Sequence, residues 1–490
     1  GMRSVGRTIR YWAAEQRNTQ VPDISGYILA NRALWVGIGL ALFAACFALF
    51  KPQRSGTGRG LRRARALPAA MSAVASASAP AKPLPKIMPA FGAATGFAQF
   101  LRQLRFDSFG VLRGIPFIVM LLFAMANFIP SAILAQTLYE TPIHPVTSQM
   151  LLALQQSYSF VLIIIVLFYA GELVGKERSA NIDEVTDAMP VPNWVPLAAK
   201  FGALIAVIFC FQLLGSIVAM LVQLAKGHTQ LELMVYAKTL VLDSIGFVLM
   251  GGLALCLQVF TNNKFAGYGL LILVLVAQGV LGALDFTHNL YNYAGSPGAP
   301  YSDMNGFGHF LGAKLWFQGY WGLFLLVLLL LSAAFWVRGV SGGARERLRL
   351  ARSRMRGPLG AATVLAALAF AGTGAYLFWN TNVRNQFLSP DDTLDLQARY
   401  EREYKKYQSL QQPRIVATAI EIDLRPETQT MRASGIYKVR NPYAKPISEL
   451  HISMIDDESL VSIDMGGSEL IKHEKDFGYR IYRLEAPMQP

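Results

Sequence analysis

The histidines and glutamates of this chain do not have the spacing that zinc binding and hydrolysis usually require. The histidines are His144, His228, His288, His309, His451 and His473. A hydrolytic zinc site of the H-E-x-x-H type needs two imidazoles one helical turn apart, with the glutamate as base. Only His473-Glu474 begins that motif, and Phe477 occupies the second histidine position. The phosphate-binding pattern G-x-x-x-x-G-K-[ST] is also missing, so we expect neither a metal site nor ATP hydrolysis in these residues.

One acidic residue, Asp243, lies well inside an apolar run, where a carboxylate facing lipid would be costly. Asp243 is either an intramembrane site for a substrate or a proton, or the acceptor of a hydrogen bond between helices, which the sequence favours. Glu172 and Lys200 fall at the ends of apolar runs, where their side chains are expected to reach water. Gly251 and Gly252 are expected to let helices pack closely rather than line a pore.

A polar segment, residues 172–200, separates two apolar runs at 151–170 and 201–224. Each run is long enough to cross a hydrocarbon layer of about 30 Å as an α-helix. Apolar and acidic side chains recur in the segment at helical spacing, which predicts a short amphipathic helix beside the membrane. Its apolar face has Ile182, Val185 and Met189, and its acidic face has Asp183, Glu184 and Asp187. Pro190 and Pro192 should end this helix, because proline lacks the amide donor.

Several residues of this segment occur in an order that is typical of one membrane-protein family. They are Glu177, Arg178, Ser179, Ala180, Ile182, Asp183, Glu184, Val185, Met189, Pro190, Val191, Pro192 and Lys200. This order resembles the first cytoplasmic loop of ABC-2 type transporter permeases, where an E-R-G-T-[LI]-[ED] run precedes a proline turn. The chain departs from that pattern at Ser179-Ala180, where Gly-Thr is usual, and by an additional Asn181.

The resemblance covers about residues 106–340 and implies a partner, because in that family the loop contacts a separate ATPase subunit. The residues implied in docking are Glu177, Arg178, Ile182, Asp183, Glu184, Val185, Asp187, Met189 and Pro190. The alternative is that the segment is an ordinary solvated loop.

The composition excludes a soluble enzyme, since 53% of the residues are hydrophobic, 16% are charged and the mean hydropathy is +0.35. The net charge of +14 would suit a nucleic-acid-binding protein, but the basic residues cluster in loops at the ends of apolar runs. We therefore expect a lipid bilayer, and not nucleic acid, as the partner. Cys46, Cys210 and Cys256 all lie in apolar runs and are interpreted as small buried hydrophobic residues.

Eight apolar segments are long enough to be membrane spans. They are residues 33–50, 115–138, 151–170, 201–224, 235–260, 267–284, 320–337 and 359–379. Residues 97–113 alternate Phe and Leu with Arg, which predicts an amphipathic helix on the inner membrane surface. The loops at 51–65 and 338–356 are strongly basic and are expected in the cytoplasm, together with residues 172–200. Everything after residue 379 is then extracytoplasmic.

A weak internal repeat bears on the N-terminal segment, which is basic although this topology places it outside. Asp23, Gly26, Tyr27 and Trp35 are echoed by Asp303, Gly306, Phe307 and Trp316. We interpret residues 1–50 as the tail and last span of a first permease half whose earlier helices are missing. A chance match is the alternative.

The C-terminal part changes character and predicts soluble structure. Residues 391–412 predict an exposed helix ending at Pro413. Alternating apolar and polar residues predict antiparallel strands at 414–424, 430–440, 447–454 and 479–484.

The same strands suggest a second family. The residues that match it are Ile420 to Pro426, Met431 to Tyr437, Arg440-Asn441 and Pro446-Ile447. They resemble the opening β-domain of aminopeptidase N-type zinc metallopeptidases. The order of permease, additional span, helix and β-domain resembles bacterial ABC-2 type permeases fused to such an aminopeptidase. Zinc would then bind only in a missing downstream domain, and ATP on the partner subunit.

The predicted fold class is an all-α polytopic membrane domain of the ABC-2 permease type, with about eight transmembrane helices, followed by the start of an extracytoplasmic antiparallel β-domain. The predicted divisions are 1–50, the end of a first permease half; 51–96, a basic and Ala/Pro-rich linker; 97–340, a six-span permease half; 341–380, a basic loop and additional span; 381–413, a helical linker; and 414–490, an incomplete β-domain.

The predicted function is that of an ABC-2 type permease subunit in a bacterial inner membrane, energised by a separate ATPase, in a parent chain that continues into an aminopeptidase-like domain. One alternative is a membrane-anchored zinc aminopeptidase whose helices act as a scaffold. Another is a non-catalytic β-domain that captures peptides on a membrane anchor. A peptide substrate and a homodimer both stay open.

Overall fold

A computed structural model describes residues 26–49, 92–134, 137–138, 141–142, 144–339, 343–428, 430–454 and 459–490. The chain divides into two units, and the first, Gly1–Pro89, contains α3 (Gly26–Leu49). This helix begins seven residues before the span predicted at 33–50. Its apolar segment, Leu29–Ala41, is shorter than the membrane-spanning candidates of the second unit. The basic loop and the linker predicted after it lie outside the described residues.

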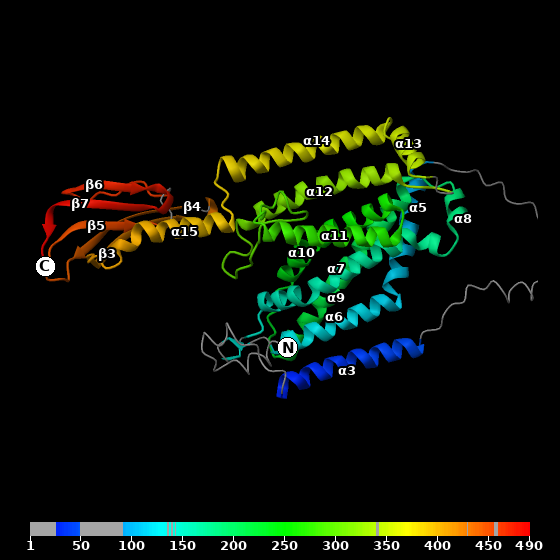
Figure 1. Cartoon of the computed structure of the whole chain (residues 1–490), viewed down its shortest axis with the longest axis horizontal. Helices are drawn as coiled ribbons and strands as arrows, with labels where there is room; N and C mark the ends of the chain where they lie inside the picture. Colours follow the sequence, from blue (N-terminus) through cyan, green and yellow to red (C-terminus); the bar gives the residue numbers. More distant parts are fainter. Residues whose placement is uncertain are drawn as a thin grey trace, which may run out of the picture. The chain divides into compact units, whose positions relative to one another are not determined.

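The second unit, Ala90–Pro490, is mostly helical, and its described residues include seven helices long and apolar enough to cross a membrane. They are α6 (Ile115–Leu134), α7 (Thr147–Ser179), α9 (Trp194–Ala225), α10 (Leu233–Thr261), α11 (Lys264–Ala283), α12 (Phe310–Phe335) and α14 (Pro358–Phe378), which continues into a π-helical turn at Trp379–Val383. Figure 1 shows these helices running along one common direction. The prediction of a multi-span helical membrane domain is confirmed at this level.

The centre of this bundle is α10, which packs against α7, α9, α11 and α12. Two glycines allow the close approach. A Cβ atom added at Gly251 would lie 2.8 Å from Leu204 Cδ2, and one added at Gly252 would lie 2.5 Å from Leu325 Cδ1. Both distances are too short for two carbon atoms, so a larger residue at either position would force Leu204 of α9 or Leu325 of α12 to move. These glycines serve helix packing, as the sequence predicts.

Three further helices lie at one end of the bundle. They are α5 (Ala93–Leu112), α8 (Asp183–Ala188) and α13 (Ala344–Arg354). In Figure 1, α5 crosses the ends of the spanning helices at the end where α8 and α13 also lie. The helix predicted at 97–113 is therefore present. It packs against α9, and its buried residues include Asp107 and Val111. A short hairpin, β1 (Thr137–Leu138) with β2 (Thr141–Pro142), follows α6.

The polar segment at 172–200 differs from the expected loop between two spans. α7 continues through Ser179 and α9 begins at Trp194, so most of the segment is helical. Only the stretch between these helices, with α8 inside it, leaves the bundle axis. The spans are longer than their apolar runs because ion pairs satisfy the charged side chains at their ends, as described below.

The C-terminal part is a helix followed by two small antiparallel sheets. Its elements are α15 (Pro390–Tyr404), a 3-10 turn (Lys405–Tyr407), β3 (Arg414–Arg425), a 3-10 turn (Pro426–Thr428), β4 (Thr430–Arg440), β5 (Ile447–Ser453), β6 (Ser468–Glu474), a 3-10 turn (Lys475–Phe477) and β7 (Tyr479–Met488). β3 pairs with β4, and the second sheet has the order β5-β7-β6. The four predicted strands are confirmed. β6 was not predicted, because adjacent Leu470 and Ile471 interrupt the alternation where the register shifts.

Aromatic side chains of α15 pack against the second sheet. The rings of Tyr404 and Tyr479 lie 4.2 Å apart, and Tyr400 lies 5.4 Å from Phe477 between centroids. A capping box at Ser389 and Asp392 begins the helix. In contrast, every residue of β3 and β4 is exposed.

A candidate docking site at one end of the helical bundle

The turn from α7 into α8 depends on Asn181. This residue has a φ of 52°, in the left-handed region that asparagine tolerates better than most residues. Its backbone N–H donates to the Arg178 carbonyl at 3.1 Å, and the Ile182 N–H donates to the Glu177 carbonyl at 3.0 Å. This pair of bonds is a Schellman motif, which satisfies carbonyls at the end of α7. The additional Asn181 is thus the residue that turns the chain out of the bundle.

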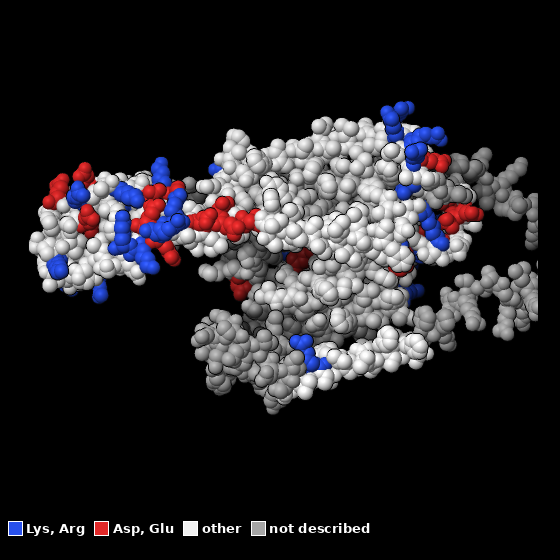
Figure 2. All heavy atoms as spheres, viewed as in Figure 1, with Lys and Arg blue, Asp and Glu red and all other residues white. Residues whose placement is uncertain are grey.

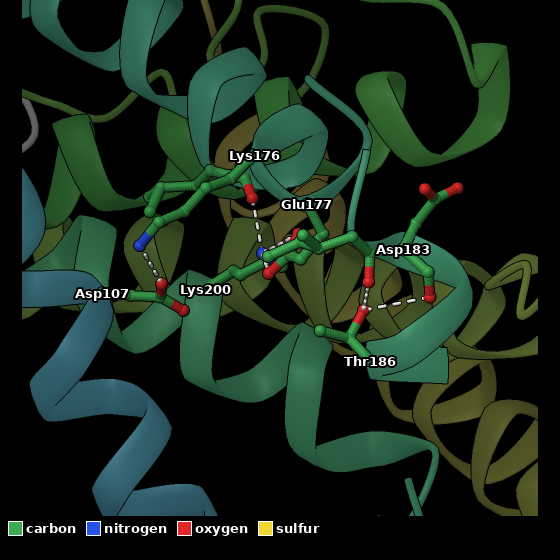
Figure 3. Close-up of polar contacts among 8 residues, drawn as sticks. Asp107, Lys176, Glu177, Asp183, Thr186 and Lys200 are labelled. Carbon is green, nitrogen blue, oxygen red and sulfur yellow. Dashed lines mark hydrogen bonds and ion pairs between the residues drawn. The ribbon is translucent and has the colours of Figure 1, made fainter. Parts of the chain in front are cut away.

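The apolar side chains of the predicted amphipathic helix are exposed. α8 spans six residues, and Ile182, Val185 and Met189 are 47%, 67% and 46% exposed. Glu184 is also exposed, whereas Asp183 is half-buried. The Thr186 hydroxyl donates within the helix to the carbonyls of Ile182 and Asp183 (Figure 3). The structure therefore presents an apolar surface that nothing among the described residues covers.

The C-terminal end of α8 and the turn after it are held to neighbouring elements. Asp187 Oδ2 accepts a hydrogen bond of 2.8 Å from the Gly339 N–H, which follows α12. Gln99 of α5 donates to the Pro190 carbonyl at 3.4 Å. Phe100 of α5 also packs on Trp194, with 5.8 Å between ring centroids. Asp187 and Pro190, both predicted as docking residues, therefore also fix the position of α8.

Beneath α8, a buried ion pair joins α7 to α9 (Figure 3). Lys200 is only 1% exposed, and its Nζ lies 2.7 Å and 2.9 Å from the two carboxylate oxygens of Glu177. The same ammonium donates to the Leu173 carbonyl at 2.5 Å. An ammonium is costly to bury unless it is paired and hydrogen-bonded, and these contacts meet that need. The prediction that Lys200 reaches water is wrong, and Glu177 points inward to Lys200.

A second ion pair joins α5 to α7. Lys176 Nζ lies 2.8 Å from Asp107 Oδ1, and the Asp107 side chain is 1% exposed (Figure 3). The ammonium also lies 4.2 Å from the centre of the Phe106 ring. The sequence carries one signal of this pair, since Asp107 is the single acidic residue in the otherwise basic helix at 97–113.

Further contacts connect this end of α7 to α10 and α11. Glu172 forms an ion pair with Lys264, the first residue of α11. Arg178 donates to Asn262, the residue that ends α10. Arg178, predicted as a docking residue, is therefore bound within the bundle.

The basic helix α13 stabilises the ends of two spanning helices. Arg347 donates to the carbonyls of Val259 and Phe260 at the end of α10, at 2.8 Å and 3.2 Å. Arg354 donates in the same way to Ala334 and Trp336 at the end of α12. Guanidinium groups suit the negative end of a helix dipole. Burial lowers the pKa of Arg347, and the nearby charge of Arg178 lowers it further.

Further charged side chains lie at the α8 end of the bundle. Figure 2 shows Lys and Arg over α13, and both signs of charge around α8. On the face shown, the surface of the spanning helices between the two ends is largely free of charge. This end therefore combines an exposed apolar helix with charged groups, which suits the binding of another protein.

Asp243 lies far from α8, in the first half of α10. Its Oδ2 accepts a hydrogen bond from Gln155 Nε2 of α7, which is the interhelical bond that the sequence favours. Asp243 also lines a cavity, together with residues of α9 and α12. Asp243 and the predicted docking residues are thus in separate places.

The residues around α8 are exposed and apolar, exposed and acidic like Glu184, or already paired with neighbouring residues, and this combination suits binding. Compared with known proteins, the chain matches no family model and none of the curated proteins.

Proposed function

We propose that this chain is a membrane subunit of an ABC-2 type transport system, driven by a separate ATPase that docks on α8. The observation that supports this proposal is the exposure of Ile182, Val185 and Met189 on and beside a short helix whose C-terminal end is held by hydrogen bonds. Exposed apolar side chains on a held helix are suited to enter a groove on a partner. Glu184 beside them would provide electrostatic complementarity to a basic rim.

The contacts beneath α8 support a role in transmitting movement. A displacement of α8 by a partner acts directly on the end of α7. Through the pairs Glu177–Lys200 and Lys176–Asp107, α7 is joined to α9 and α5. Movement of the ATPase subunits would then reach several spanning helices through charged contacts rather than through one flexible loop.

In this proposal the end of the bundle with α8 and α13 faces the cytoplasm of a bacterial cell, and the sheets after α15 lie on the other side of the inner membrane. The exposed arginines of α13 support that orientation, because basic residues are retained on the cytoplasmic side. The C-terminal sheets would belong to an aminopeptidase-like domain, in keeping with the family that their strands resemble.

The test is co-purification with an ABC ATPase subunit from the same organism, expressed together with the full chain. We expect Val185→Asp to weaken the complex by about a hundredfold, because a charge at an apolar anchor typically costs a few kcal/mol. The matched control is Leu348→Asp, since Leu348 is an exposed apolar residue of α13 at the same end of the bundle. Equal recovery of the ATPase with Val185→Asp and with the unchanged chain would contradict docking on α8.

A further inference from the structure

A cavity of about 510 Å³ lies between α7, α9, α10 and α12. The residues of α7, α10 and α12 that line it come from the first half of each helix, and Gln212 of α9 and the loop before α12 contribute the rest. Because α8 follows the end of α7, this cavity is near the opposite end of the bundle from α8. Its volume is within the usual range for sites that bind small molecules, roughly 300–1,000 Å³.

Two side chains of opposite charge line this cavity, Asp243 from α10 and Lys314 from α12. Lys314 is near enough for its charge to act on Asp243, yet the two do not form an ion pair. Gln155 occupies Oδ2 of Asp243, and Oδ1 has no partner among the described residues. The Lys314 ammonium also has no hydrogen-bond or ion-pair partner among the described residues. Charges between spanning helices are costly unless something pairs with them, so the cavity favours a ligand that satisfies both.

The remaining polar groups are suited to orient such a ligand. Gln212 of α9, Thr239 of α10 and Gln318 of α12 line the cavity, and each is less than a tenth exposed. Gln318 Nε2 donates to the Leu242 carbonyl, while its Oε1 has no hydrogen-bond partner among the described residues. Neutral amides and a hydroxyl between two opposite charges provide hydrogen bonds without preferring one sign of charge.

We propose that this cavity binds a small zwitterion, an α-amino acid or a short peptide. Its ammonium group pairs with Asp243 Oδ1, and its carboxylate pairs with Lys314. A simple cation would leave Lys314 unpaired and be repelled by it, and a simple anion would meet the same difficulty at Asp243. Only a ligand with both charges satisfies both side chains.

This site does not depend on the docking of an ATPase at α8. Binding is measured on the purified full chain alone, whereas docking is measured by co-purification. A negative binding experiment would therefore not contradict docking at α8, and a negative co-purification would not contradict the binding site.

The experiment is equilibrium dialysis of the detergent-purified full chain with radiolabelled L-alanine and L-alanyl-L-alanine. The two probes distinguish an amino acid from a peptide, and binding of either supports the site. We expect Asp243→Asn and Lys314→Gln each to weaken binding roughly tenfold or more, since each removes a charge-assisted contact. Glu232→Gln and Lys238→Gln are the matched controls, because both residues are exposed, outside the cavity and at the start of α10. These controls should bind like the unchanged chain.

A second measurement keeps the proposal testable if a cavity variant fails to fold. N-acetyl-L-alanine lacks the ammonium and L-alaninamide lacks the carboxylate, and neither should compete with the bound zwitterion on the unchanged chain. Equal competition by either compound would overturn the proposal. Binding of neither zwitterion by the unchanged chain would also overturn it.

Discussion

Lys200 and Glu177 give a residue-scale test of how the α8 end is held together. Lys200 is 1% exposed, whereas the Glu177 side chain is 22% exposed and keeps some contact with water. Replacing Lys200 by Met leaves a partly buried carboxylate without its partner. We expect Lys200→Met to lower the free energy of unfolding by about 3 kcal/mol, near the lower end for a broken buried pair. Thermal unfolding of the detergent-purified chain measures the effect.

The control for this prediction is Lys238→Met, at an exposed lysine of α10. The double variant with Lys200→Met and Glu177→Gln should recover part of the loss, because it also removes the unpaired charge. A loss for Lys200→Met no larger than that for Lys238→Met would show that the pair does not stabilise the bundle.

A second residue-scale prediction concerns His451 of β5. Its Nδ1 lies 2.8 Å from the Tyr479 hydroxyl, and its side chain is 5% exposed. Burial lowers the pKa of His451, and Glu449 opposes that effect with a smaller contribution. The unfolded chain therefore binds a proton at a higher pH than the folded chain does. The stability that neutral His451 provides is complete above about pH 6.5 and is lost as the pH falls through the lower folded value.

Hydrogen exchange in β5 and β7, corrected for the intrinsic rate at each pH, measures this loss. We expect exchange in the unchanged chain to quicken as the solution is acidified below about pH 6.5. His451→Gln should remove that dependence, while His473→Gln on β6, the strand on the other side of β7, should retain it. The same acid dependence in His451→Gln would assign the effect to other groups.

The exposure or burial of a side chain could be predicted where it depends on a local sequence pattern. The exposure of Ile182, Val185 and Met189 follows from a helical repeat within eight residues. The inward direction of Glu177 and the burial of Lys200 do not, since they depend on how α7 and α9 pack together, and the two residues are 23 positions apart. Asp107 was missed for the same reason: its partner Lys176 lies on another helix.

At the scale of elements, helices were easier to predict than their ends. The spans were expected to stop where apolar residues stop, but α7 continues for nine residues past the predicted limit at residue 170. Ion pairs with α5, α9 and α11 make that extension stable, and a linear sequence does not display them. β6 was missed because its strand pattern contains a register shift rather than simple alternation.

The close contact between α10 and α12 at Gly252 gives an element-scale prediction. A side chain at Gly252 would collide with Leu325, so Gly252→Val should separate the two helices. We expect a loss of about 1–3 kcal/mol in the free energy of unfolding, as is usual for overpacked interiors. Thermal unfolding of the purified chain measures it.

The matched control is Gly279→Val in α11, where an added Cβ atom would meet nothing within 4 Å. This control separates the collision from the general effect of valine in a helix. Equal losses in the two variants would mean that α12 adjusts freely and that Gly252 does not set the helix spacing.

At the scale of the whole molecule, composition and periodicity were enough to predict a helical membrane domain followed by small antiparallel sheets. Seven of the eight predicted spans correspond to helices long enough to cross a membrane, and the remaining one falls in α3. The cavity could not be predicted. Asp243 stands out in the sequence as an acid within an apolar run. Gln155 and Lys314, which line the same cavity, belong to helices separated by more than a hundred residues, so the sequence does not show that the three lie together.

In the proposed function, α8 and α13 face the cytoplasm, where an ATPase can reach α8, and the C-terminal sheets face the opposite side of the membrane. Single cysteines at Val185, Ser353 and Ser434 test it directly, in a chain whose Cys46, Cys210 and Cys256 are replaced by serine or alanine. Val185, Ser353 and Ser434 are all exposed and lie in α8, α13 and β4.

The measurement is labelling of intact cells with a membrane-impermeant maleimide, before and after permeabilisation. We expect the cysteine at position 434 to be labelled in intact cells, and those at 185 and 353 to be labelled only after permeabilisation. Labelling of position 185 in intact cells, with protection of position 434, would place α8 outside the cytoplasm and contradict the account.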